Sequence, residues 1–225
     1  MNGSDLHKQA EEMREQGKFG EALRLCDEAF VAYSKEKNSE KLAEVCASRA
    51  LTLRHLADSN GDKSFLILAK YAAKAGVKII ENSGSEVGIS IPLYTLGKVF
   101  ESMEKFDKAS EKIQVAIEKG SVLPKSTLAE MKTRLDSINY RLGEPAALES
   151  FNADVQDLES GDFEDDYVKN VWISGAYMHM AEALISKGEK EKASELLSKA
   201  RIIIDSDARL ILRSKQLSHI SESIS

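Results

Sequence analysis

The chain has 225 residues, of which 42% are hydrophobic and 30% are charged, enough for a packed core and a solvated surface. It contains 3 Pro and 13 Gly, which is too few turn-forming residues for an all-β sandwich of this length. The formal net charge of −6 has the wrong sign for coating a phosphate backbone, so nucleic acid is excluded as a partner.

The first thirty residues are polar and amphipathic and lack the apolar stretch of a secretory signal. No window approaches ~18 consecutive apolar residues, so we expect no membrane insertion. These two observations predict a cytoplasmic location in a reducing compartment.

An internal repeat extends along the chain. Aliphatic residues recur at spacings of 44, 43, 39 and 45 residues, at Ala22, Leu66, Ala109, Leu148 and Ala193. Seven residues after each of them comes a small or β-branched residue, at Ala29, Ala73, Ala116, Val155 and Ala200. A period near 40 residues is typical of a stacked repeat rather than of one compact core.

Each repeat has the pattern of two helices, most clearly in the third. Apolar residues at helical spacing run from Leu93 to Met103, a short turn follows, and a second apolar stripe runs from Ala109. Gly97 would let the two antiparallel helices approach closely. Pro92 either opens the first helix of this unit or kinks one that starts near Ser85. The expected units are 4–36, 39–82, 85–120, 124–160 and 167–205, with a terminal cap at 206–222.

Helix ends carry recognisable signals. Gly17 suits the left-handed residue that closes a helix. Thr127 with Glu130, and Ser83 with Glu86, have the spacing of a capping box and predict helix starts.

The run Leu93-x-x-Leu96-Gly97-x-x-Phe100, followed by Ala109-x-x-x-Ile113, resembles the tetratricopeptide repeat. The resemblance extends over nearly the whole chain, in the longer form of about forty residues. It implies an all-α fold, a right-handed superhelix of about five antiparallel helix pairs with a C-terminal capping helix, forming a single domain over residues 1–225.

Two of the repeats depart from the family pattern. The second has Arg54 where Gly or Ala is usual. The fourth has Asp136, Asn139 and Asn152 at positions that are usually apolar or small.

Proteins of this family generally bind peptides or partner proteins in a concave groove lined by the first helix of each pair. The resemblance places on that face His7, Glu11, Arg14, Leu51, His55, Tyr94, Lys98, Glu101, Thr133, Ser137, Tyr140, Met178, Glu182 and Ile185. Their mixed charge and apolar content would suit a peptide or helix with both kinds of side chain. The alternative is that they form ordinary solvated helix faces. The Lys/Asn pair of the chaperone-binding members is absent, since its starting positions hold His7 and Glu11.

No sequence pattern predicts catalysis, a cofactor or a metal. None of the four histidines has His or Cys three or four residues away, as a helical metal site requires. The acidic run 157–166 resembles a calcium loop only in composition, because Gln156 and Leu158 stand at ligand positions. We therefore interpret it as a solvated linker. Phosphate-binding and nucleophile-elbow motifs are missing, so we expect no enzyme activity.

Cys26 and Cys46 lie about equally far from the expected turn between the first two helix pairs. Antiparallel packing would put them at similar height. They are either two buried, reduced thiols used as small apolar side chains or a pair that bridges on oxidation.

The sequence as a whole predicts a non-catalytic scaffold or adaptor that binds a protein or peptide. Two alternatives stay open, a regulatory protein switched by a peptide and a structural module that associates weakly with itself.

Overall fold

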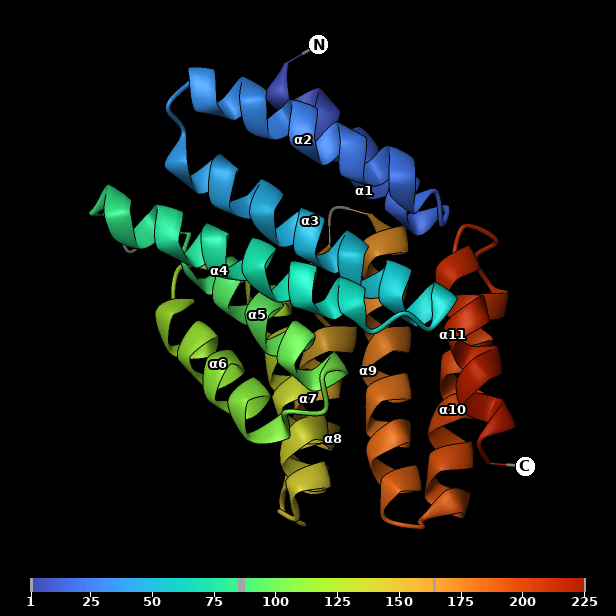
Figure 1. The fold of residues 1–225 in the computed structure, drawn as a ribbon. Helices are drawn as coiled ribbons and strands as arrows, with labels where there is room; N and C mark the ends of the chain where they lie inside the picture. Colours follow the sequence, from blue (N-terminus) through green and yellow to red (C-terminus); the bar gives the residue numbers. More distant parts are fainter. Residues whose placement is uncertain (1, 85–87, 164, 225) are drawn as a thin grey trace. The chain divides into compact units, whose positions relative to one another are not determined.

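The computed structural model describes residues 2–84, 88–163 and 165–224, and this part consists of α-helices joined by turns (Figure 1). The helices are α1 (Gly3–Glu15), α2 (Phe19–Lys35), α3 (Ser39–Asn60), α4 (Ser64–Ser83), α5 (Ser90–Ser102), α6 (Phe106–Lys119), α7 (Lys125–Leu142), α8 (Ala147–Glu159), α9 (Asp166–Ser186), α10 (Lys190–Asp205) and α11 (Ile211–Glu222). They fall into two compact units, Met1–Ser121 and Val122–Ser225, which we describe one at a time.

The described helices confirm the predicted five pairs and terminal helix. In the first unit the pairs are α1–α2, α3–α4 and α5–α6; in the second they are α7–α8 and α9–α10, followed by α11. The first helices of successive pairs also pack together within a unit, α3 against α1 and α5, and α7 against α9. α11 packs on α9 and α10, as an end cap should.

Some of the predicted helix ends are confirmed and one is wrong. Gly17 has the expected left-handed backbone, with φ 75°. Thr127 does not cap a helix, because α7 already begins at Lys125, directly after an extended Pro124. Pro92 lies in the first turn of α5, so it opens this helix rather than kinking it. The proposed partner of Ser83, Glu86, lies outside the described residues.

The small residues of the repeat lie where helices cross. Every alanine in the two rows of the repeat is fully buried, with 0% exposure: Ala22, Ala29, Ala73, Ala109, Ala116, Ala193 and Ala200. Short side chains at these positions bring the helix axes close together and exclude water from the contact.

The core of the second unit is built around large side chains from α8 and α9. Phe151, Met180 and Leu184 are at most 1% exposed and belong to one cluster with residues of α10 and α11. Burying an apolar side chain of this size stabilises the fold by about 1.5–3 kcal/mol. The first unit has a separate cluster that contains Leu6, Leu25 and Tyr33.

Candidate protein-interaction face

The first helices of the first unit are joined by a polar contact. Arg14 of α1 donates a hydrogen bond from Nη1 to Ser48 Oγ of α3, at 3.2 Å. Earlier on α1, His7 Nε2 lies 3.9 Å from Glu11 Oε1. Burial lowers the pKa of His7, so the ring is mostly neutral at pH 7. Glu11 stays in solvent, with 51% of its side chain exposed.

Further along this unit the expected residues are less accessible. On α3, Leu51 is half-buried and His55 is buried, with its Nε2 3.3 Å from Arg54 Nη2. On α5, Tyr94 is buried and Lys98 Nζ lies 4.1 Å from the centre of its ring, a cation–π contact. Glu101 and Lys98 are half-buried.

In the second unit an arginine that the sequence did not single out connects the two first helices. Arg134 Nη2 of α7 lies 2.7 Å from His179 Nε2 of α9. A guanidinium only donates, so Nε2 accepts this bond and the proton of a neutral ring sits on Nδ1. His179 Nδ1 lies 3.4 Å from Glu182 Oε2, and 41% of the Glu182 side chain is exposed.

Two residues expected in the groove are engaged in the interior of the second unit. Met178 is 1% exposed and belongs to its hydrophobic cluster. Tyr140 is 9% exposed and its hydroxyl donates to Glu189, just before α10, a bond that raises the pKa of Tyr140. Both side chains are buried, so neither offers much surface to a partner. The sequence did not predict this, because helical periodicity shows on which side of a helix a residue lies but not how deeply its neighbours cover it. Of the other expected positions in this unit, Thr133 and Ser137 are buried and Ile185 is half-buried.

The acidic run has structural contacts within the second unit. Glu159 accepts a hydrogen bond from the Tyr177 hydroxyl at 2.6 Å. Asp165 caps α9 by accepting from the backbone N–H of Tyr167 at 2.8 Å, and it lies 3.7 Å from Arg209. Glu164 lies outside the described residues. In residues 2–84, 88–163 and 165–224, no three His, Cys, Asp or Glu side chains gather closely enough to hold a metal ion.

None of the helices described is both long and apolar enough to cross a membrane.

Both cysteines are free and buried. Burial raises the pKa of Cys26, on α2, and of Cys46, on α3, to about 11 in each case. The thiolate is the reactive form of a cysteine. Raising the thiol pKa from 9 to about 11 reduces the fraction present as thiolate roughly a hundredfold at neutral pH.

We therefore expect both thiols to react with a maleimide or disulfide reagent at least about a hundred times more slowly in the native chain than in urea. Stopped-flow labelling at pH 7.5 measures this ratio. Fast reaction of either thiol in the native chain would contradict the burial, and a mobility shift on oxidation without reductant would favour the bridge.

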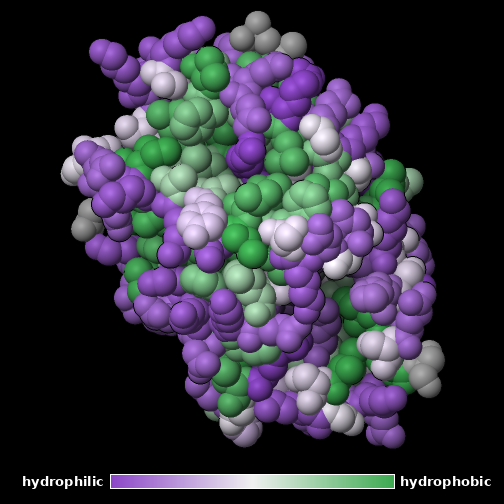
Figure 2. Space-filling view, in the orientation of Figure 1, coloured by the Kyte–Doolittle hydropathy of each residue, from purple (hydrophilic) through white to green (hydrophobic). Residues whose placement is uncertain are grey.

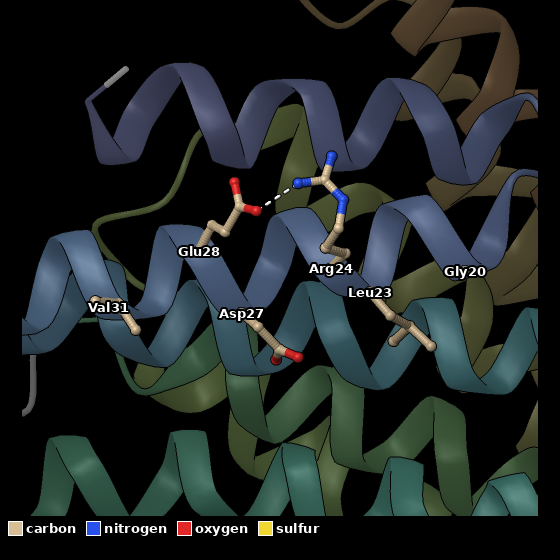
Figure 3. Close-up of a pocket in the computed structure, with 6 residues that line it drawn as sticks. All are labelled: Gly20, Leu23, Arg24, Asp27, Glu28 and Val31. Carbon is tan, nitrogen blue, oxygen red and sulfur yellow. Dashed lines mark hydrogen bonds and ion pairs between the residues drawn. The ribbon is translucent and has the colours of Figure 1, made fainter.

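An open hollow of about 600 Å³ lies on α2, a second helix, where the sequence predicted no site. It is lined by Gly20, Leu23, Arg24, Asp27, Glu28 and Val31 (Figure 3). Its charges are paired: Arg24 bonds to Glu28, and Asp27 to Arg49 of α3. Figure 3 shows Leu23 and Asp27 pointing toward α3, away from Arg24 and Glu28. Because its charges are paired in this way, the hollow is close to neutral.

Comparison with known proteins places the fold. No protein-family model and no curated protein matches the sequence. Among solved structures, the nearly identical TPR-like repeats of a putative kinesin light chain from Podosopora anserina match with a TM-score of 0.56 and 16% identity, over 91% of this chain and 96% of that one. The chain has a TPR-like fold.

Two further solved structures match the fold of this chain to a similar degree. A single-substitution variant of the same repeats gives a TM-score of 0.57 at 16% identity, over 90% of this chain and 94% of that one. BtubC (BKLC) from P. vanneervenii gives 0.54 at 17% identity, over 86% of this chain and 76% of that one. The helix pairs of the TPR-like chain thus recur in proteins with little sequence in common with it.

Proposed function

We propose that the chain is a non-catalytic scaffold that binds a peptide or a partner helix on the face that the first helices form within a unit. The observation that carries the proposal is that these helices pack side by side within each unit and share polar contacts. Arg14 reaches from α1 to Ser48 of α3, and Arg134 reaches from α7 to His179 of α9. Within a unit, a row of first helices gives a partner several turns of helix to contact at once.

In each unit the accessible part of this proposed face carries a carboxylate beside a histidine, Glu11 with His7 on α1 of the first unit and Glu182 with His179 on α9 of the second. Exposed carboxylates accept hydrogen bonds and attract cationic side chains. We therefore assign the face to a partner segment that carries Lys or Arg together with apolar residues. A cytoplasmic location belongs to the same proposal, and its support is that both cysteines are free thiols.

A peptide-display selection against the full chain tests this assignment. We expect enriched peptides to lose about tenfold or more in affinity on a Glu11→Lys/Glu182→Lys variant. The matched control is Glu21→Lys/Glu195→Lys, which makes the same change of net charge at exposed positions on the second helices α2 and α10.

Affinity is measured by fluorescence anisotropy after circular dichroism has shown that each variant is folded. Equal affinities for the two double variants, or a selection that enriches no peptide, would overturn the proposed function.

A further inference from the structure

A face of α4 that the fold does not use carries exposed apolar and basic side chains. Ile67, Leu68 and Tyr71 are 48%, 52% and 61% exposed. Lys74 and Lys78 continue the same face by one and two turns and are also exposed. Scattered apolar residues on a surface need no explanation, but three within five residues of one helix form a patch of the kind that marks an interaction site.

The opposite face of α4 accounts for its place in the fold. It buries Leu66, Ala69, Ala73 and Ile80, and α4 packs on α3 and α5. In the space-filling view, hydrophobic surface gathers over the middle of the face on which Figure 1 shows α2, α3 and α4, with hydrophilic residues around it (Figure 2). The packing of the first unit therefore does not use the exposed apolar residues of α4 and does not explain why they are there.

The charge on this helix is opposite in sign to that of the chain. Lys70 Nζ lies 4.7 Å from the centre of the Tyr71 ring, and Lys78 Nζ lies 3.6 Å from Glu81. Within the part of the chain that the structure describes, Lys70 and Lys74 make no ion pair. A chain of net charge −6 thus presents one helix face on which apolar side chains are followed by two exposed lysines, Lys74 without an ion pair among the described residues and Lys78 paired with Glu81.

We propose that this α4 face, defined by Ile67, Leu68, Tyr71, Lys74 and Lys78, is a second docking surface for an acidic, amphipathic segment of a protein partner. Apolar side chains of the segment cover Ile67, Leu68 and Tyr71, and its carboxylates pair with Lys74 and Lys78. Tyr71 is the central anchor, since it combines a large apolar ring with a polar hydroxyl.

Charge complementarity favours a protein segment over an anionic membrane. A short segment meets only this basic face, whereas a flat bilayer would also approach the carboxylates of an acidic chain, Glu81 among them. The surface lies on a second helix, so it is distinct from the face proposed for the first helices, and either assignment can fail alone.

The probe is a fluorescein-labelled 16-residue peptide with Leu and Phe at i, i+3, i+4 and i+7 spacing and Glu at the remaining positions; a peptide with Lys in place of Glu is its control. We expect saturable binding of the Glu peptide to the full chain and none of the Lys peptide. A Lys74→Glu/Lys78→Glu variant should lose about tenfold or more in affinity, and the affinity of the native chain should fall with salt.

The matched control variant is Lys105→Glu/Lys108→Glu, which makes the same change of charge at exposed positions near the start of α6 and should bind within about twofold of the native chain. A second variant, Leu68→Ser/Tyr71→Ser, removes apolar surface from positions whose exposure makes it tolerable to the fold, and it should also weaken binding of the Glu peptide.

Absence of saturable binding, or equal loss in both charge-reversed variants, would overturn the proposal. Co-sedimentation with phosphatidylcholine–phosphatidylserine vesicles that depends on Lys74 and Lys78 would replace the protein partner by a membrane. A dimer in sedimentation velocity that the Lys74→Glu/Lys78→Glu variant dissolves would replace it by a second copy of the chain.

Discussion

Replacing Gly97 by alanine lowers the free energy of unfolding by about 1–3 kcal/mol, even though alanine is the better helix former by about 1 kcal/mol. A Cβ at this position of α5 would lie 2.5 Å from Ile113 Cγ1 and 3.2 Å from the carbonyl oxygen of Ala109, both on α6. Ile113 is 0% exposed, so its side chain has no free space to move into. The two helices of the third pair must separate to accept the methyl group.

Gly20→Ala is the control, because Gly20 also lies in a helix, in the first turn of α2, and a Cβ there meets nothing within 4 Å. This substitution should leave the free energy of unfolding unchanged or raise it by up to about 1 kcal/mol, since it adds helix propensity without a clash. Urea titrations followed by circular dichroism measure both variants. A stabilised Gly97→Ala chain would show that α5 and α6 do not approach as closely as described.

Replacing Asp136 by asparagine stabilises the second unit at pH 8.5 by about 2 kcal/mol or more. Asp136 is 8% exposed on α7, its Oδ2 is buried without a hydrogen-bond partner among the described residues, and Asp154 of α8 lies against it. Burial, and then the charge and hydrogen bond of Asp154, raise the pKa of Asp136 to about 8, while Lys132 opposes the shift. Lys132 lies 3.6 Å from Asp154.

The raised pKa sets the direction of the pH dependence. Between about pH 4 and pH 8 the folded chain keeps a proton on Asp136 that the unfolded chain has lost, because a free aspartate has a pKa near 3.9. The free energy of unfolding therefore falls as the pH rises through this window. Asp136→Asn removes that contribution, because an amide does not titrate.

Urea titrations at pH 5.5, 7.0 and 8.5 test this, with Asp157→Asn as the control at an exposed carboxylate of α8. We expect the native and Asp157→Asn chains to lose stability together across this range and Asp136→Asn to lose less. A pH profile for Asp136→Asn parallel to that of the native chain would show that Asp136 is ionised in the folded state at neutral pH.

The sequence predicted the helix pairs well because the spacing of apolar and small residues is a direct consequence of helix geometry. Gly97 was found in this way, since a residue without a side chain on an apolar stripe indicates a helix crossing. Asp136 was recognised as an unusual residue for its position, but its burial depends on how α7 and α8 pack, which no local pattern records.

The candidate face was harder to predict, because it depends on contacts between helices far apart in the sequence. Met178 shares the helical spacing of an accessible residue and yet lies in the core, and Arg134 looks like a surface residue until His179 is placed 45 positions further along the chain. The exposed apolar residues of α4 were missed for the opposite reason: Ile67 and Leu68 resemble core residues in sequence.

Hydrogen–deuterium exchange of the full chain, with and without a peptide enriched against it, tests the assignment of the binding face most directly. We expect slower exchange in α1, α3, α5, α7 or α9, strongest near Glu11 or Glu182 and weaker or absent in the second helices. Protection confined to α2, α4, α6, α8 or α10, with the first helices unchanged, would contradict it.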